Sequence, residues 1–340
     1  MTAPAQLSGA ITVSSFKRKP PPLPVRYGFA AVMFGVFTPL MWGAEKLGRA
    51  DRMFKSMRAR QLRELAKGNP FKEYVPGTQD VIVATYPKSG TNWMMQIAHQ
   101  LVYNGQAEFD HIHNFVPWPD VMPPFMQGYA IPLELADHWK TSPGQRRVIK
   151  SHYDWNLLPH SDQARYIMVI RDPKDVFVSS YHFVKEIMFG RAMPSVDTWF
   201  KVFLSRGFMG GDWAENTAGY WEQRHRPNVL VMSFKAMKRD LRGTVLKVAE
   251  FMDLHPSAEV VDEVCRRSSF DYMKRIDDKF RPWQVGPWRP EPTMIRSGKQ
   301  GGSSELMSRE QQRQMDAHFI EELKRLNCDF PYEEFCDLAR

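Results

Sequence analysis

The most constraining feature of this chain is an apolar, β-branched run followed at once by a glycine-containing turn and a helical pattern. Residues 81–86 read VIVATY, residues 87–93 read PKSGTNW and residues 94–103 read MMQIAHQLVY, which predicts strand, loop and helix in succession. Gly90 would let the loop backbone approach an anion, and Lys88 would add a positive charge beside the N–H groups that begin the helix. The loop therefore suits a phosphate group. Because the lysine precedes the glycine, the pattern differs from a Walker A loop, which disfavours an ordinary ATP or GTP site.

Strands continue to alternate with helices after this unit. This alternation predicts a central parallel sheet covered by helices on both faces, in a single α/β domain with a P-loop-like phosphate site over residues 71–340. A helix is expected from Lys238 to Met252, and residues 281–303 read as a long ordered loop. The further strands are predicted at residues 147–150, 164–170 and 228–234.

Composition narrows the class of protein. With 340 residues, 43% hydrophobic and 25% charged, the chain is long enough for a stable core and is neither wholly disordered nor a multi-span membrane protein. Its three cysteines form no CxxC pair, which argues for a reducing compartment and against a structural zinc site. The net charge of +8 is concentrated at the N-terminus, where residues 1–70 hold twelve Lys or Arg against three Asp or Glu. This placement indicates an anionic surface rather than a nucleic acid.

The N-terminal region reads as two segments before the main domain. Residues 1–26 contain KRKPPPLPVR and are expected to form an extended, disordered tail. Residues 27–70 combine an uncharged apolar run, 27–44, with a basic amphipathic helix, a pattern typical of membrane association through residues 27–66. If the run spans a bilayer, the main domain lies on the cytoplasmic side. The alternative is a helix packed on the domain with its Arg and Lys side chains in solvent.

Four ordered motifs resemble the PAPS-dependent sulfotransferases of the cytosolic type. Residues 85–93, TYPKSGTNW, are similar to the family's TYPKSGTxW loop, and residues 171–183, RDPKDVFVSSYHF, to its RNPKDVxVSYYHF element. Residues 150–152, KSH, resemble its K-[TS]-H motif, although the usual Leu-Pro after the histidine is missing. Residues 295–302, IRSGKQGG, are similar to RKGxxGDW but lack its second basic residue and its Asp-Trp. The resemblance spans roughly residues 71–335.

This resemblance implies a donor, a mechanism and a set of site residues. The donor would be 3′-phosphoadenosine 5′-phosphosulfate (PAPS), with PAP as product, no metal, and in-line transfer of a sulfuryl group to a hydroxyl. His152 would be the general base, and Lys88 and Lys150 would stabilise the leaving phosphate, which agrees with imidazole titrating near neutrality and with the strength of electrostatic stabilisation. Arg171, Ser179 and Arg296 would hold the 3′-phosphate. The residues implied in donor binding are Lys88, Ser89, Gly90, Thr91, Asn92, Trp93, Arg171, Ser179, Phe234, Ser268, Phe270, Arg296, Ser297 and Gly298.

The acceptor side is predicted to be apolar. Phe115, Trp118 and Tyr153 are expected to line its pocket, and residues 116–118, VPW, fall where the family has a substrate-contacting Val-Pro-Phe. The acceptor would be a small, largely apolar alcohol, phenol or lipid, and the protein would be cytoplasmic, at the cytoplasmic face of a membrane if residues 27–66 bind one. The sequence does not specify an oligomeric state.

Two other functions stay open at this level. One is a catalytically inactive, sulfotransferase-like protein that binds a membrane surface, which the altered Ser297 and Gly302 favour. The other is an ATP-dependent kinase, which would need an acidic Mg²⁺ ligand at a strand end, where only Asp172 is a candidate.

Overall fold

A computed structural model of the chain describes most of its length. The described residues are 16–71, 73–120, 128–205, 210–283, 292–296, 298 and 301–339.

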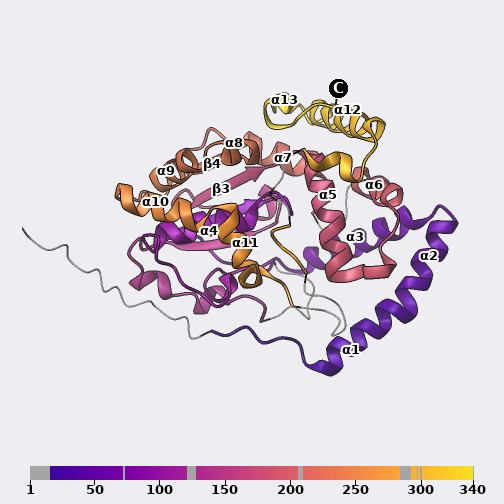
Figure 1. Ribbon diagram of the computed structural model, residues 1–340, viewed down its shortest axis with the longest axis horizontal. Coiled ribbons are helices and arrows are strands. Elements are labelled where there is room, and N and C mark those ends of the chain that lie inside the picture. Colours follow the sequence, from indigo (N-terminus) through magenta and orange to yellow (C-terminus); the bar gives the residue numbers. More distant parts are fainter. Residues whose placement is uncertain are drawn as a thin grey trace, which may run out of the picture.

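Four parallel strands form the centre of the molecule (Figure 1) in the order β2-β1-β3-β4. All four strands predicted from the sequence are confirmed, and β1 pairs with both β2 and β3, so that Val83 lies opposite Lys150 and Ala84 lies opposite Met168. Parallel alignment brings the carboxyl ends of all four strands to one edge. The strands are β1 (Asp80–Thr85), β2 (Arg147–Ser151), β3 (Arg165–Ile170) and β4 (Val229–Ser233).

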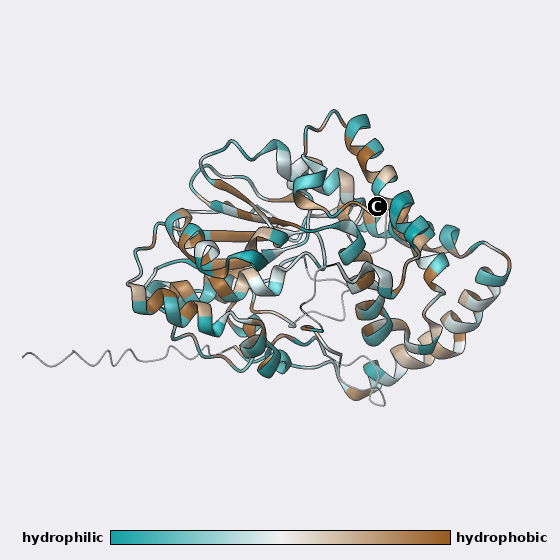
Figure 2. Ribbon diagram, turned by 45° about the horizontal axis from the view of Figure 1, so that its top comes forward, coloured by the Kyte–Doolittle hydropathy of each residue, from teal (hydrophilic) through white to brown (hydrophobic). Residues whose placement is uncertain are grey.

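Both faces of the sheet are buried, as expected for parallel strands that helices cover on each side. Val81 and Val83 point into a core shared with α4, α9 and α10, whereas Ile82 and Ala84 point into a second core that includes Tyr220 of α7. Figure 2 shows the strongly hydrophobic residues along these central strands. The helices of the main body are α4 (Thr91–Val102), α5 (Pro173–Val184), α6 (Val196–Leu204), α7 (Trp213–Glu222), α8 (Phe234–Arg239), α9 (Leu241–Phe251), α10 (Ala258–Arg267), α11 (Phe270–Arg275), α12 (Arg309–Arg325) and α13 (Tyr332–Phe335).

The single helix expected from Lys238 to Met252 is two helices, and that prediction is wrong. Asp240 adopts an extended conformation, with φ −142° and ψ 87°, and its carboxylate accepts a hydrogen bond of 2.8 Å from the Gly243 N–H. Aspartate favours this N-cap position because its oxygen satisfies an otherwise unpaired N–H group. Asp240 therefore ends α8 and begins α9.

The N-terminal region is helical from Leu23, so the last four residues of the expected tail, 23–26, belong to a helix. α1 (Leu23–Val32), a π-helical turn (Met33–Phe37) and α2 (Thr38–Lys46) form one continuous helix, and α3 (Ala50–Lys67) follows it. Pro24 is tolerated because it lies in the first turn, where its missing N–H has no intrahelical partner.

These N-terminal helices share a core with the main body. Met41 and Phe54 are completely buried, Phe37 stacks on Phe189 at 5.0 Å, and the Phe54 ring meets Trp199 of α6 edge-on at 5.7 Å. In Figure 1 they run along the edge of the molecule beside α5 and α6. The segment is therefore an integral part of the folded unit.

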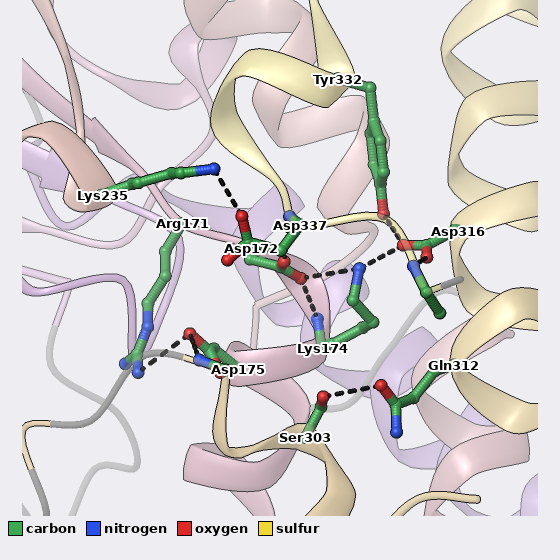
Figure 3. A network of polar contacts seen from close by, with 12 residues as sticks. Arg171, Asp172, Lys174, Asp175, Lys235, Ser303, Gln312, Asp316, Tyr332 and Asp337 are labelled. Carbon is green, nitrogen blue, oxygen red and sulfur yellow. Dashed lines mark hydrogen bonds and ion pairs between the residues drawn. The ribbon is translucent and has the colours of Figure 1, made fainter. Parts of the chain in front are cut away.

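A buried polar network ties the C-terminal helices to the start of α5 (Figure 3). Lys174 forms ion pairs with Asp316 of α12 and, at 3.3 Å, with Asp172. The Tyr332 hydroxyl donates to Asp316 at 2.8 Å, and the Asp337 N–H donates to Asp172 at 2.9 Å. The carboxylates of Asp172 and Asp316 thus each pair with a cation and accept hydrogen bonds.

Lys174→Met should destabilise the protein, because it leaves Asp172 and Asp316 buried without their cation. Breaking a buried pair costs about 3–5 kcal/mol, which denaturant unfolding would measure as a lower free energy of unfolding. The matched control is Lys235→Met, which removes an ion pair of 2.5 Å with Asp337 between half-exposed side chains. That loss should stay below about 1 kcal/mol. Equal losses in the two variants would contradict the structural role of the buried network.

Candidate active site

A cavity of about 720 Å³ lies at the carboxyl ends of the four strands. Lys88 follows β1, His152 follows β2, Arg171 follows β3 and Phe234 follows β4, and all four side chains line the cavity. Ligands of open α/β sheets bind at this edge because the loops from adjacent strands meet there. Residues that are far apart in the sequence are therefore assembled into one site by the sheet register.

The turn between β1 and α4 has the backbone geometry of an anion-binding loop. Lys88 and Gly90 adopt positive φ values of 70° and 101°. A Cβ at position 90 would lie 2.7 Å from the Phe234 ring, so both the conformation and the space require glycine. The Thr85 and Thr91 hydroxyls lie 2.5 Å apart and join the two ends of the loop. The first turn of α4 faces the cavity through Thr91, Asn92 and Trp93.

Two lysine ammonium groups at this cavity each lie over the face of one aromatic ring. Lys88 Nζ lies 3.9 Å from the centre of the Phe183 ring, and Lys150 Nζ lies 3.4 Å from that of Trp118. Burial lowers the pKa of each lysine to about 7. Neither forms an ion pair within the described part of the chain, so their charge is available to an anionic ligand.

His152 is held in one neutral tautomer. Its Nδ1 lies 2.9 Å from the Thr85 carbonyl oxygen, which can only accept, so Nδ1 carries the proton and Nε2 keeps a free lone pair. The Trp118 ring packs edge-on at 5.4 Å. Burial, and then the charges of Lys150 and Lys88, lower the pKa of His152 to about 3. The imidazole is therefore neutral at physiological pH and can accept a proton at Nε2.

Asp120 supports this histidine, and the sequence prediction missed it. Its Oδ2 accepts a hydrogen bond of 2.7 Å from the His152 backbone N–H, while its Oδ1 has no hydrogen-bond partner among the described residues. Burial raises its pKa to about 6, although the nearby Lys150 counteracts the effect. The only sequence signal was its position two residues beyond Trp118 in a Trp-Pro-Asp run.

Arg171, at the end of β3, contacts the turn between β1 and α4. Its Nη1 donates to the Lys88 carbonyl at 2.9 Å, its Nη2 lies 3.8 Å from Asp175, and the guanidinium stacks 4.4 Å from the centre of the Phe234 ring. The pairing with Asp175 uses one side of the guanidinium. However, Nε is buried with no partner in the described part of the structure, and Ser179, one turn beyond Asp175, lines the same cavity. The guanidinium can therefore contribute to an anion site while it is paired.

Trp93, Phe234, Ser268, Phe270 and Gly298 of the predicted donor site line the same cavity, whereas Ser89 does not. Trp93 packs edge-on against Phe234 at 5.5 Å and donates its indole N–H to the Ser268 carbonyl at 2.8 Å. Phe270 lies over Gly298, where a Cβ would approach its ring to 2.4 Å. The hydroxyl groups of Ser268 and Ser89 are buried without a hydrogen-bond partner among the described residues.

The segment that departs from the family pattern is described only in part. Arg296 lines the cavity and forms an ion pair of 2.9 Å with Glu305. Ser297 lies outside the described residues. Gly302 also lines the cavity, and the Ser303 hydroxyl donates to Gln312 of α12 at 2.9 Å. Ser303 thus contacts α12.

The structure separates the three residues predicted for the acceptor pocket. Trp118 and Tyr153 line the cavity, and the buried Tyr153 hydroxyl has no hydrogen-bond partner in the described chain. Phe115 does not line it, and this assignment is corrected. Its ring packs between His99 at 5.4 Å and His138 at 5.0 Å, inside the core beneath α4.

The N-terminal helices contribute cavity residues that sequence reasoning did not assign. Phe29 of α1 and Arg58, Gln61 and Leu65 of α3 line it. The basic amphipathic pattern correctly predicted α3. From the same pattern, Arg58 was expected to be one of several cations on the protein surface. Only the packing of α3 on the body shows that this arginine faces inward.

Comparison with known proteins identifies the family. The model of the sulfotransferase domain matches residues 78–327, most of the chain. The chain belongs to the sulfotransferase family. An amine sulfotransferase of Oryctolagus cuniculus is 31% identical over 267 residues, covering 76% of this chain and 84% of that protein. A luciferin sulfotransferase of Photinus pyralis is 33% identical over 216 residues, covering 57% and 56%.

Solved structures confirm the fold. Retinol dehydratase in complex with androsterone and the inactive cofactor PAP superposes with a TM-score of 0.60 at 20% identity, covering 75% of this chain and 84% of that one. A mouse sulfotransferase complexed with PAP gives a TM-score of 0.56 at 20% identity, covering 75% and 87%. The predicted α/β sulfotransferase fold is therefore confirmed.

The family assignment supports an enzyme and removes the basis of the kinase alternative. That alternative depended on Asp172 as a ligand for Mg²⁺. The Asp172 carboxylate instead caps α5 by accepting from the Lys174 N–H at 2.9 Å and pairs with the Lys174 ammonium. No cluster of three or more potential metal ligands occurs among the described residues.

Asp120→Ala should lower kcat, because His152 loses the acceptor that fixes its backbone. We expect a loss on the order of 100-fold, with binding of PAP unchanged. Asp120→Asn keeps an oxygen that can accept the same N–H, so it should retain most of the turnover. Steady-state kinetics with PAPS, together with PAP-induced shifts in melting temperature, would measure both effects. Equal losses in the two variants would show that the carboxylate charge, and not this hydrogen bond, matters.

Proposed function

We propose that this sulfotransferase moves a sulfuryl group from PAPS to the hydroxyl of a small, largely apolar acceptor by in-line displacement, with His152 as general base. The observation that carries the proposal is the meeting of Lys88, Lys150 and the free Nε2 of His152 on one cavity, beside the phosphate loop. PAPS, when bound, supplies a sulfuryl group on a phosphate leaving group.

The described residues fit this donor. Unpaired ammonium groups and the first turn of α4 suit the phosphosulfate, because cations and helix N-termini both favour anions. The buried Arg171 Nε and Ser268 Oγ, which lack partners in the described chain, are positioned to bind the 3′-phosphate and the nucleoside. Trp93 and Phe234 offer aromatic surfaces for the adenine. The PAP bound to the two superposed proteins supports the same choice of donor.

In the transfer step, the acceptor oxygen forms a bond to sulfur while the bond from sulfur to the phosphate oxygen breaks. The hydroxyl proton passes to Nε2 of His152, and the electron pair of the broken bond leaves with the phosphate of PAP. Lys88 and Lys150 stabilise the negative charge that grows on this leaving group, which is often the largest single contribution to catalysis. The protein thus supplies a base for the proton and cations for the leaving group.

The acceptor half of the cavity supports an apolar substrate. Trp118, Phe183, Leu65 and Leu157 provide hydrophobic walls, and the unpartnered Tyr153 hydroxyl provides a polar contact. Pockets of this composition bind apolar molecules with one or two polar groups.

We also infer a location at the cytoplasmic face of a membrane. Cys265, Cys328 and Cys336 are free thiols, which supports a reducing compartment. One helix of the described chain, Leu23–Lys46, is long and apolar enough to cross a membrane by length and composition.

His152→Ala should abolish most turnover and leave donor binding intact. A general base contributes about 100-fold to 10⁴-fold to the rate, and the substitution leaves the phosphate loop unchanged. Transfer from sulfur-labelled PAPS would measure turnover, and the PAP-induced melting shift would measure binding. His255→Ala is the matched control, because that side chain is 89% exposed. An unimpaired rate in His152→Ala would exclude this histidine as the base.

PAP affinity should decrease as the pH rises from about 7 to about 9. The folded protein lowers the pKa of Lys88 and Lys150 from 10.5 to about 7, so each carries its positive charge mainly below that pH. Above it, PAP binding must take up protons. Calorimetric titration at several pH values would measure the dissociation constant, and adenosine, which lacks phosphates, is the control. A pH-independent PAP affinity would show that the two lysines do not contact the phosphates.

A further inference from the structure

The N-terminal helices present two different surfaces. Their inner surface completes the acceptor end of the cavity through Phe29, Arg58 and Leu65, although they lie outside the matched domain of residues 78–327. Leu65 belongs to the same hydrophobic cluster as Leu157, and the Asn69 side chain just after α3 donates to the Leu157 carbonyl at 2.7 Å. These helices therefore form part of the wall of the cavity.

The outer surface of the Leu23–Lys46 helix is apolar and uncovered. Val32, Val36 and Leu40 follow one another at four-residue spacing, which places them on one face of the helix, and they are 57%, 54% and 60% exposed. Trp42 is 52% exposed nearby. From residue 27 to residue 44 the sequence contains no charge. A contiguous exposed apolar face of this kind marks an interaction surface.

The inner face fixes the orientation of the helix. Ala30, Met33 and Met41 are buried against the body, and Glu45 accepts hydrogen bonds of 2.8 Å from the Ser195 N–H and from the Thr198 hydroxyl. Figure 1 shows the helix at the edge of the molecule, and its second half, α2, contacts α3 and the turn of residues 190–192. A helix fixed in this way cannot cross a bilayer without leaving its core contacts, but it can lie in a membrane surface with its outer face immersed.

Positive charge adjoins this apolar face. α3 packs beside α2, and its Lys55 pairs with Asp51 at 3.6 Å. Cations next to an apolar helix contribute about 1 kcal/mol each to binding an anionic membrane. The exposed basic residues around α3 are Lys46, Arg49, Arg52, Lys55, Arg60 and Arg63.

We propose that α1, α2 and α3 lay the protein on an anionic bilayer and that the acceptor, a lipid alcohol, enters the cavity from that bilayer past Phe29, Arg58 and Leu65. The proposal rests on the proposed sulfuryl transfer and adds the source and chemical class of the acceptor. Charge complementarity selects an anionic membrane over a second copy of this chain, whose N-terminal segment would carry the same positive charge.

The first experiment measures membrane binding of the full chain. Val32→Glu, Val36→Glu and Leu40→Glu together should lower flotation with vesicles of phosphatidylcholine and phosphatidylserine by at least about tenfold, because three charges replace the immersed apolar face. Leu246→Glu is the matched control, since Leu246 is 48% exposed on α9. It should float like the unmodified protein. Equal flotation of all three proteins, or a dimer in light scattering that only the triple variant dissociates, would overturn the proposal.

The second experiment measures acceptor delivery. Hexadecanol embedded in the same vesicles and n-butanol in solution serve as acceptors with PAPS. The triple variant should lose at least about tenfold in kcat/KM for hexadecanol and keep its rate with n-butanol within about twofold, because its pocket is unchanged. Equal losses with both alcohols, or none with either, would overturn membrane loading alone. If the unmodified protein sulfates neither alcohol and PAP does not stabilise it, the proposed function itself is wrong.

Discussion

The central constraint on this structure is that it buries two lysine ammonium groups, neither of which forms an ion pair with a carboxylate in the described chain. Moving an ionised amine out of water costs several kcal/mol unless an opposite charge compensates it. Here Lys88 and Lys150 lie against aromatic faces. Burial lowers the pKa of each lysine, although the charges of Glu186 and Asp277 on Lys88, and of Asp120 on Lys150, counteract it. The backbone therefore holds them in place: Arg171 donates to the Lys88 carbonyl at 2.9 Å, and Lys150 is the fourth residue of β2, paired in register with β1. An anionic ligand would supply the missing charge.

The carboxylates at the start of α5, and the one that contacts it from α12, are paired with cations other than these two lysines. Asp172 caps α5 and pairs with Lys174, Asp316 takes the other side of the same ammonium, and Asp175 faces Arg171. Figure 3 shows these pairings at the start of α5. The network that holds α12 and α13 on the body thus pairs Asp172 and Asp316 with Lys174.

Sequence analysis correctly predicted the features that depend on short local patterns. The four strands, the anion loop at Gly90 and the cavity positions of Lys150 and His152 all follow from short motifs whose geometry is set by neighbours in the chain. Sequence reasoning failed where contacts between residues far apart in the chain determine the position of a side chain. Phe115 was predicted to line the acceptor pocket because it is aromatic, but its ring packs in the core beneath α4. Asp120 was missed because one unpatterned carboxylate carries no local signal until the fold brings it to the His152 N–H.

The N-terminal segment shows why a membrane pattern and a packed helix are hard to separate by sequence. Residues 27–44 are apolar on all sides of the helix, as a membrane-spanning helix would be. Only one side packs on the protein, through residues such as Met33 and Met41. The other side is apolar and exposed, which suits contact with a membrane. Because the same segment carries a wall of the cavity, deleting residues 1–70 would open both the core around Phe54 and the acceptor pocket. Membrane binding and catalysis can therefore be separated only by substitutions on the outer face.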